Sequence, residues 1–117
     1  MLDLRSAHLK AFRRLRLAQF HERLRTHLES HLPAQTAAAG PARVEELIRF
    51  GHRRAVHYGI AAERDICKMV SVMLVLGPDF DRAPWARRIL EEPTLSSGMR
   101  MHRVLMAALE RLEQGEA

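Results

Sequence analysis

The chain has 117 residues, of which 47% are hydrophobic and 28% are charged. This size allows one domain and leaves no room for a second hydrophobic core, and the hydrophobic share excludes a chain that is disordered throughout. The single cysteine, Cys67, excludes an internal disulfide and a cysteine-based zinc site.

The positive charge is concentrated toward the start of the chain. There are 19 Lys and Arg residues against 14 acidic ones, a formal net charge of +5. Residues 1–32 hold seven basic and three acidic residues, an excess of four, whereas residues 67–117 hold seven of each. A basic segment of this kind suits nucleic acid, an anionic membrane surface or an acidic protein partner.

Residues 2–32 contain no Gly or Pro and are predicted to form one long helix that Pro33 ends. Two sets of apolar residues follow helical spacing on different faces. The first set is Leu4, Ala7, Ala11, Leu15 and Ala18; the second is Leu17, Phe20, Leu24 and Leu28. Leu9 and Phe12 fall outside the first set. The helix is therefore either bent or broken near Ala18, or contacted from two sides. The second alternative indicates an oligomer or a partner.

Residues 33–41 (PAQTAAAGP) are predicted to form a loop or hinge by composition. The next helix is expected over residues 42–58, with Gly51 on its apolar face; the best reason for a glycine there is close approach of a neighbouring helix. Gly59 is expected to end this helix.

Residues 61–76 form the most apolar stretch and are predicted to be a buried helix, ended by Gly77 and Pro78. Glu63 and Asp65 suit the positive end of its dipole. A turn at 79–82, a short helix at 84–90 and a last helix capped by Ser96 or Ser97 complete the chain. The sequence thus predicts an all-α fold: one small bundle of about five helices, with a long basic helix at 1–32, a loop at 33–41 and a helical core at 42–114.

No catalytic or metal-binding pattern is found. His27 and His31 share a helical face, but the glutamate that a zincin needs directly after the first histidine is absent. The carboxylates that could work as an acid–base pair are expected to serve turns and caps: Asp79, Asp81, Glu91 and Glu92. Cys67 is expected in the core. We therefore expect no enzyme, no cofactor and no bound metal.

Nucleic acid remains an alternative partner for the first helix. With a turn of about 100° per residue, Arg5, Arg16 and Arg23 cluster while Arg14 and Arg25 lie roughly opposite, which is typical of a solvated helix. Membrane association is not expected, because the apolar stripe drifts around the helix. The longest apolar run, at 69–76, is far shorter than the ~20 residues that span a bilayer, and residues 1–16 contain no secretory signal. The expected location is the cytoplasm.

Several short segments resemble a known family: IRFG at 48–51, YGI at 58–60, ERDI at 63–66, LGPDFD at 76–81 and PWA at 84–86. The pattern is similar to small helical proteins encoded beside type VI secretion effectors and their adaptor chaperones in Gram-negative bacteria. The resemblance covers about two thirds of the chain. It implies an accessory role, such as a co-chaperone or adaptor for effector loading, and an immunity protein of the same locus is the alternative.

These observations give a hypothesis for function and site. The protein is expected to be non-enzymatic and to bind an effector or its adaptor through Leu9, Phe12 and Leu17, with a homo-oligomer also possible. Within the family-like segments, Gly51, Gly59, Gly77 and Trp85 are expected to build the fold first. An exposed docking spot formed by Asp79, Asp81 and Trp85 is the functional alternative.

Overall fold

The computed structural model describes residues 4–115, and in this range it contains helices and no strand. The helices are α1 (Leu4–His31), α2 (Pro33–Ala39), α3 (Pro41–His57), α4 (Glu63–Leu76), α5 (Pro84–Leu90) and α6 (Ser97–Glu113), with a 3-10 turn, η1 (Phe80–Arg82), before α5. The all-α bundle is confirmed. The helices expected at 42–58 and 61–76 agree with α3 and α4 to within two residues, and the helix expected at 84–90 is α5.

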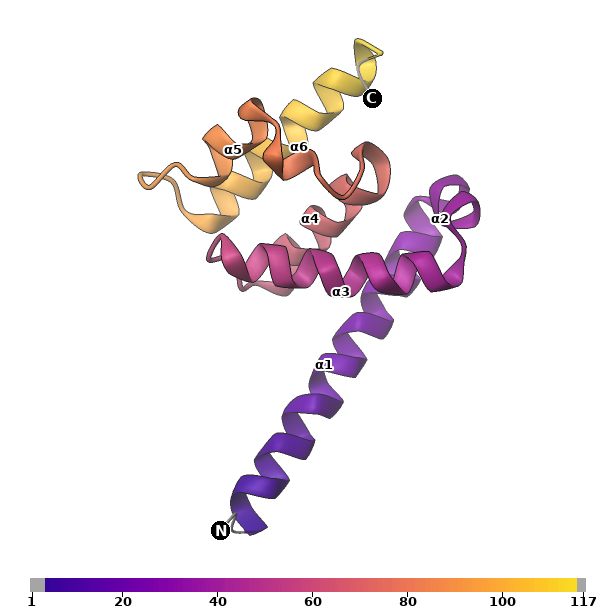
Figure 1. Ribbon diagram of the computed structural model, residues 1–117, viewed down its shortest axis with the longest axis vertical. Coiled ribbons are helices and arrows are strands. Elements are labelled where there is room, and N and C mark those ends of the chain that lie inside the picture. Colours follow the sequence, from indigo (N-terminus) through magenta and orange to yellow (C-terminus); the bar gives the residue numbers. More distant parts are fainter. Residues whose placement is uncertain (1–3, 116–117) are drawn as a thin grey trace.

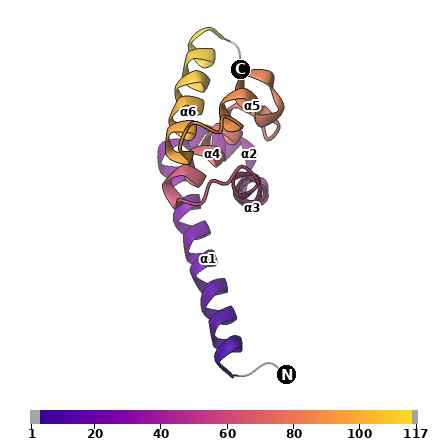
Figure 2. The ribbon, with the colours of Figure 1, turned by 90° about the vertical axis from the view of Figure 1, so that its left-hand side faces the viewer.

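α1 has two halves with different surroundings (Figures 1 and 2). Its C-terminal half packs on α2, α3 and α4 through Phe20, Leu24 and Leu28, which are buried. Its N-terminal half projects beyond the bundle, so that the molecule measures 56 × 37 × 19 Å. The helix is continuous over 28 residues, about 42 Å at 1.5 Å per residue. Of the two alternatives, a break of the helix near Ala18 is therefore not present.

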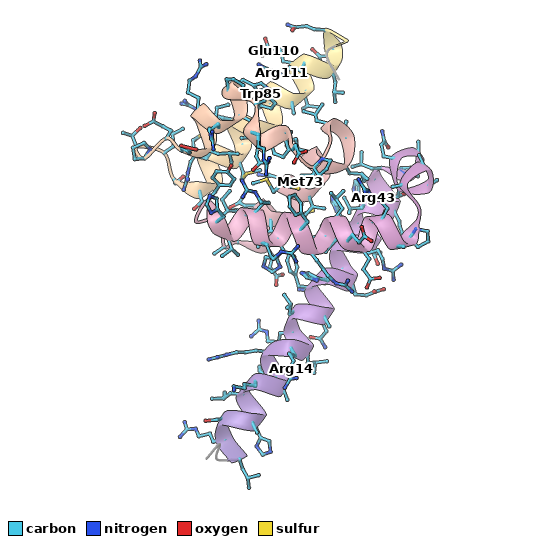
Figure 3. All side chains as sticks on the ribbon, in the orientation of Figure 1. Arg14, Arg43, Met73, Trp85, Glu110 and Arg111 are labelled. Atoms are coloured by element: carbon cyan, nitrogen blue, oxygen red, sulfur yellow. The ribbon has the colours of Figure 1, made fainter. Side chains whose placement is uncertain are left out.

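The centre of the bundle is the crossing of α3 and α4, where Met73 lies (Figure 3). Gly51 permits this crossing: a Cβ added there would lie 2.6 Å from Val70 Cγ2 and 3.2 Å from Met73 Sδ. Both neighbours are buried, so neither has free space to move into. The close approach predicted at Gly51 is confirmed.

Gly51→Ala is expected to lower the free energy of unfolding by about 1–2 kcal/mol, because overpacking outweighs the better helix propensity of alanine. Gly98→Ala is the matched control: its Cβ would meet only Asp65 Oδ2, at an ordinary 3.8 Å, and it should leave stability unchanged or raised. Urea denaturation of both variants checks this. Equal stability of the two would contradict the tight α3–α4 contact.

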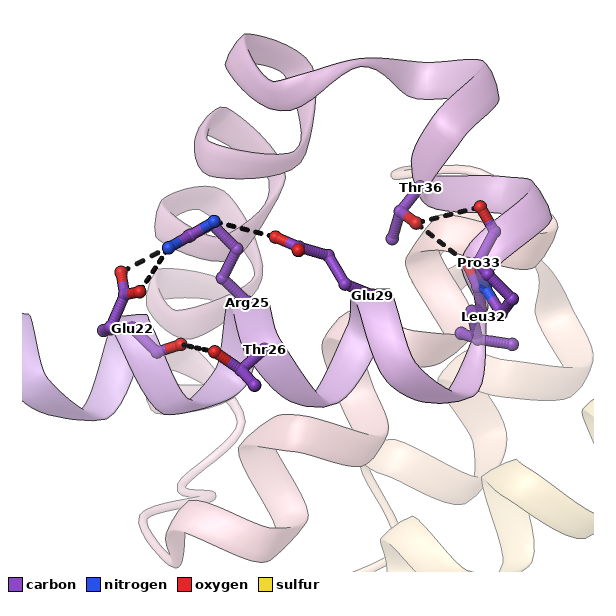
Figure 4. A network of polar contacts seen from close by, with 7 residues as sticks. All are labelled: Glu22, Arg25, Thr26, Glu29, Leu32, Pro33 and Thr36. Atoms are coloured by element: carbon purple, nitrogen blue, oxygen red, sulfur yellow. Dashed lines mark hydrogen bonds and ion pairs between the residues drawn. The ribbon is translucent and has the colours of Figure 1, made fainter.

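The loop expected at 33–41 is wrong, because seven of these residues form α2. Pro33 occupies the first turn, where its missing N–H is harmless, and four alanines follow with the highest helix propensity. The buried Thr36 hydroxyl donates to the carbonyls of Leu32 and Pro33, both at 3.1 Å (Figure 4). Gly40, with φ +86°, makes the corner between α2 and α3.

The C-terminal helices are joined to the rest by polar and aromatic contacts. Ser96 caps α6 by accepting from the Met99 N–H. Arg100 on α6 donates to the carbonyl oxygens of Tyr58 and Leu90 at 3.0 and 2.7 Å, which connects the ends of α3 and α5. Trp85 anchors α5 as expected: the Arg111 guanidinium lies over its ring, 4.0 Å from the centroid (Figure 3).

Candidate interaction site

The projecting half of α1 exposes large apolar side chains. Their exposed fractions are 78% for Leu4, 48% for Leu9, 57% for Phe12, 54% for Leu15 and 44% for Leu17. The predicted partner-binding residues on this helix therefore all lie at the surface. Phe20, one helical turn further, is buried in the bundle. The boundary between the free and the packed part of α1 thus falls between Leu17 and Phe20.

The two apolar sets of α1 lie on widely separated faces. Their mean directions differ by roughly 140° when each residue turns the helix by about 100°. Of the second set, Phe20, Leu24 and Leu28 are buried against the bundle, whereas Leu17 is 44% exposed. The other set is exposed along its whole length, and we call it the Ala–Leu stripe: Leu4, Ala7, Ala11, Leu15 and Ala18. No other part of the described chain covers this stripe.

The projecting half is strongly basic. Residues 4–21 contain five Lys and Arg side chains and no acidic one. No ion pair within residues 4–115 involves these five side chains, which are Arg5, Lys10, Arg13, Arg14 and Arg16. The first acidic side chain along the described helix, Glu22, already pairs with Arg25, which also reaches Glu29 at 2.7 Å (Figure 4). The surface therefore combines apolar area with uncompensated positive charge.

A groove of about 870 Å³ opens where α3 crosses α1. Leu17 and Ala18 of α1 and Ile48 and Val56 of α3 supply its apolar surface, and arginines from both helices line it. Ala18 belongs both to this groove and to the Ala–Leu stripe. The groove therefore continues directly onto the exposed face of the projecting helix.

A histidine pair joins α1 to α3 beside the groove. His21 Nε2 and His52 Nδ1 are 2.8 Å apart, and the edge of His52 meets the ring of Phe20. Burial lowers the pKa of His21, and the nearby His52 and Arg49 lower it further. Burial also lowers the pKa of His52, although Glu63 partly opposes this shift. One neutral ring donates and the other accepts, so the contact requires that the pair is not fully protonated.

This pair predicts a fall in stability on acidification. Because both folded-state pKa values lie below the ordinary 6.5, the unfolded chain takes up protons first, and the free energy of unfolding drops as the pH falls through about 6.5 toward the folded-state values. His52→Gln should flatten this slope, whereas His102→Gln on the exposed face of α6 should not. Urea denaturation between about pH 7.5 and 5 checks it. If His52→Gln left the pH dependence of the free energy of unfolding unchanged, the His21–His52 pair would not be its cause.

The docking spot proposed at Asp79, Asp81 and Trp85 is not present as an exposed surface. Asp81 is 1% exposed; it accepts from Arg54 Nε and Nη2 at 3.0 and 2.6 Å and from the Tyr58 hydroxyl at 2.8 Å. Only Asp79 is exposed, and Trp85 is half-buried. Asp79 and Asp81 differ in exposure because Asp81 lies on the inner side of η1, facing α3.

The Arg54–Tyr58–Asp81 network is structural. The hydrogen bond to Asp81 raises the pKa of Arg54. Burial, and then the hydrogen bond to Asp81, raises the pKa of Tyr58, so Arg54 stays charged and Tyr58 stays neutral at neutral pH. Sequence analysis missed this network because its members are up to 27 residues apart. The spacing of Arg54 and Tyr58, one helical turn, was the only available signal.

The candidate ligands and nucleophiles do not come together as a metal or catalytic site within residues 4–115. The exposed rings of His27 and His31 stack at 4.1 Å, and no group of three or more His, Cys, Asp or Glu within residues 4–115 is placed to hold a metal ion. Cys67 is half-buried, and burial raises the pKa of its thiol. Glu91 pairs with Arg87, and Glu92 accepts from Thr94. These carboxylates therefore serve local structure.

No helix among residues 4–115 is both long and apolar enough to cross a bilayer. Comparisons of the chain with protein-family models, with curated proteins and with solved structures return no match. The assignment of a role therefore depends on the geometry of the projecting helix and its groove, and the resemblance noted in the sequence stays a prediction.

Proposed function

We propose that this protein is a non-enzymatic accessory protein that holds another protein through the projecting half of α1. The observation that carries the proposal is the exposure of five large apolar side chains on a helix segment that nothing else in the described chain covers. Several large apolar side chains exposed together on one helix segment, on more than one of its faces, indicate an interaction site. A helix segment without tertiary contacts is also only marginally stable in water, so a partner stabilises it.

A second copy of this helix is a poor partner. Pairing two projecting halves would bring together two segments that each carry five positive charges and no acid, and such like-charge pairing is unfavourable. An acidic protein surface satisfies both the apolar stripe and the charge. Duplex nucleic acid satisfies the charge but leaves the exposed leucines and Phe12 without an apolar counterpart.

The partner that we propose is a type VI secretion effector or its adaptor chaperone. The support is the resemblance of the segments at 48–51, 58–66 and 76–86. In the fold these segments contain Gly51, Tyr58, Asp81 and Trp85, which pack and connect α3, α4, η1 and α5. They build the scaffold from which α1 projects. A co-chaperone or adaptor role is the first proposal, and an immunity protein that covers the toxin is the alternative within the same locus.

Co-expression tests this proposal. The full chain, tagged at its C-terminus, is produced together with the effector and the adaptor encoded by the neighbouring genes, and the proteins retained on the affinity resin are identified. We expect one of them to co-purify in a defined ratio. Retention of neither, together with a shift of duplex DNA that weakens steeply with salt, would replace the proposal with nucleic-acid binding.

A further inference from the structure

The groove and the Ala–Leu stripe together form a track for one helix. Ala7, Ala11 and Ala18 are small, so a second helix axis can come close to α1 along this face. From Leu4 to Glu22 the track is about 27 Å long, and at its inner end it enters the 870 Å³ groove floored by Ile48 and flanked by Val56. A narrow apolar track that ends in a groove is the shape that receives an amphipathic helix.

The charge along the track specifies the partner further. Arg14 on α1 and Arg53 on α3 face the groove from its two walls, are exposed and take part in no ion pair within residues 4–115. The other two arginines of the groove are already neutralised, Arg25 by Glu22 and Glu29 and Arg49 by Glu45. Neither guanidinium is paired with a carboxylate, although Arg14 Nε donates to the Lys10 carbonyl oxygen at 3.5 Å, and both stand at positions where an incoming helix would place carboxylates.

We propose that the α1–α3 groove and the Ala–Leu stripe seat an acidic amphipathic helix of the partner protein, with its apolar face on Ala11, Leu15, Ala18 and Val56 and its acidic residues on Arg14 and Arg53. This inference rests on the proposed function and names the chemistry of its ligand. Leu9 and Phe12 lie outside the stripe, so other parts of the partner cover that side of α1.

The test uses the full chain and a labelled helical peptide of about 21 residues, long enough to follow the whole track. In the acidic peptide, Leu and Ala form the apolar face, Glu occupies the positions on both sides of that face, and Gln occupies the outer face. The basic peptide has Lys at every position where the acidic peptide has Glu. Fluorescence anisotropy gives the two dissociation constants. We expect the acidic peptide to bind at least about tenfold tighter than the basic one at low salt.

Charge reversal locates the binding site. Arg14→Glu with Arg53→Glu should weaken the acidic peptide by about tenfold or more and strengthen the basic one. Arg64→Glu with Arg88→Glu changes the net charge equally at exposed positions on α4 and α5 and should leave the preference for the acidic peptide intact. Val56→Asp, at a 60% exposed position, should weaken the acidic peptide without unfolding the chain.

Equal binding of the acidic and the basic peptide would overturn the inference, and so would equal effects of the two charge-reversal pairs on peptide binding. Dimerisation of the protein that rises with its concentration and excludes the peptide would also contradict it. The last contradicting result would be displacement of the peptide by anionic vesicles or duplex DNA that bind through Arg14 and Arg53. The co-expression experiment separates the two claims. If the partner co-purifies equally with the wild type and with the Arg14/Arg53 variant, the function stands and the acidic helix is wrong. If the peptides bind as expected and no protein from the neighbouring genes is retained, the acidic-helix site stands and the proposed partner is wrong.

Discussion

Replacing Asp81 by alanine is expected to lower the free energy of unfolding by about 2–4 kcal/mol, the largest effect that we expect for any single polar residue. The change leaves Arg54 and the Tyr58 hydroxyl without the carboxylate that they share. Because the Arg54 side chain is 26% exposed, water compensates part of the loss, which keeps the value below that of a fully buried pair. Thermal and urea denaturation both measure it.

Asp79→Ala is the matched control, two residues away and exposed; its stability should stay within about 0.5 kcal/mol of the wild type. Partner binding supplies the second readout, since Asp81 is enclosed and should matter only through folding. If Asp81→Ala were as stable as Asp79→Ala but lost the partner, the residue would be a docking residue after all.

The second large effect is expected on binding. Combined replacement of Leu9, Phe12 and Leu17 by serine should weaken retention of the protein partner by about 100-fold or more. This loss is about 2.7 kcal/mol, which requires each side chain to contribute only about as much as one buried CH₂ group. The fold should survive, since about half of each side chain is exposed and exposed positions carry little stability. Circular dichroism and thermal denaturation establish that the variant remains helical.

A control of equal apolar loss is available on the other side of the molecule. Met99, Met106 and Leu109 on α6 are 45%, 52% and 45% exposed, close to the values for Leu9, Phe12 and Leu17. Their replacement by serine should leave retention of the partner unchanged. If the two triple variants lost partner retention equally, non-specific hydrophobic contact, and not the projecting helix, would hold the partner.

Local features of the chain made most of the fold predictable. Pro33, Gly59 and Gly77 end helices close to the expected positions, and Gly51 marked the α3–α4 contact correctly. The error at α2 came from counting Pro and Ala as loop residues, although proline is well placed in a first helical turn and alanine favours helix. Packing of α2 on α1, α3 and α4, with Thr36 buried, then stabilises seven residues that composition alone did not identify.

The candidate site was predictable only in part. Two apolar sets on different faces of α1 already implied that one of them lacks a partner within the chain. The set that does so is Leu4, Ala7, Ala11, Leu15 and Ala18, and the exposure of Leu9 and Phe12 fits their place outside it. Leu17 shares the face of the buried residues and is exposed because the bundle ends before it. The groove could not be foreseen, since it depends on where α3 crosses α1. The same holds for the pairing of His21 with His52, which are 31 residues apart.

Hydrogen exchange of the chain with and without its protein partner tests the central claim most directly. In the free protein the amides of residues 4–17 should exchange quickly, because this half of α1 has no tertiary support, whereas those of α3 and α4 should be protected. Addition of the partner should slow exchange throughout residues 4–17. A complex that forms while these amides continue to exchange at the rate of the free chain would contradict the account.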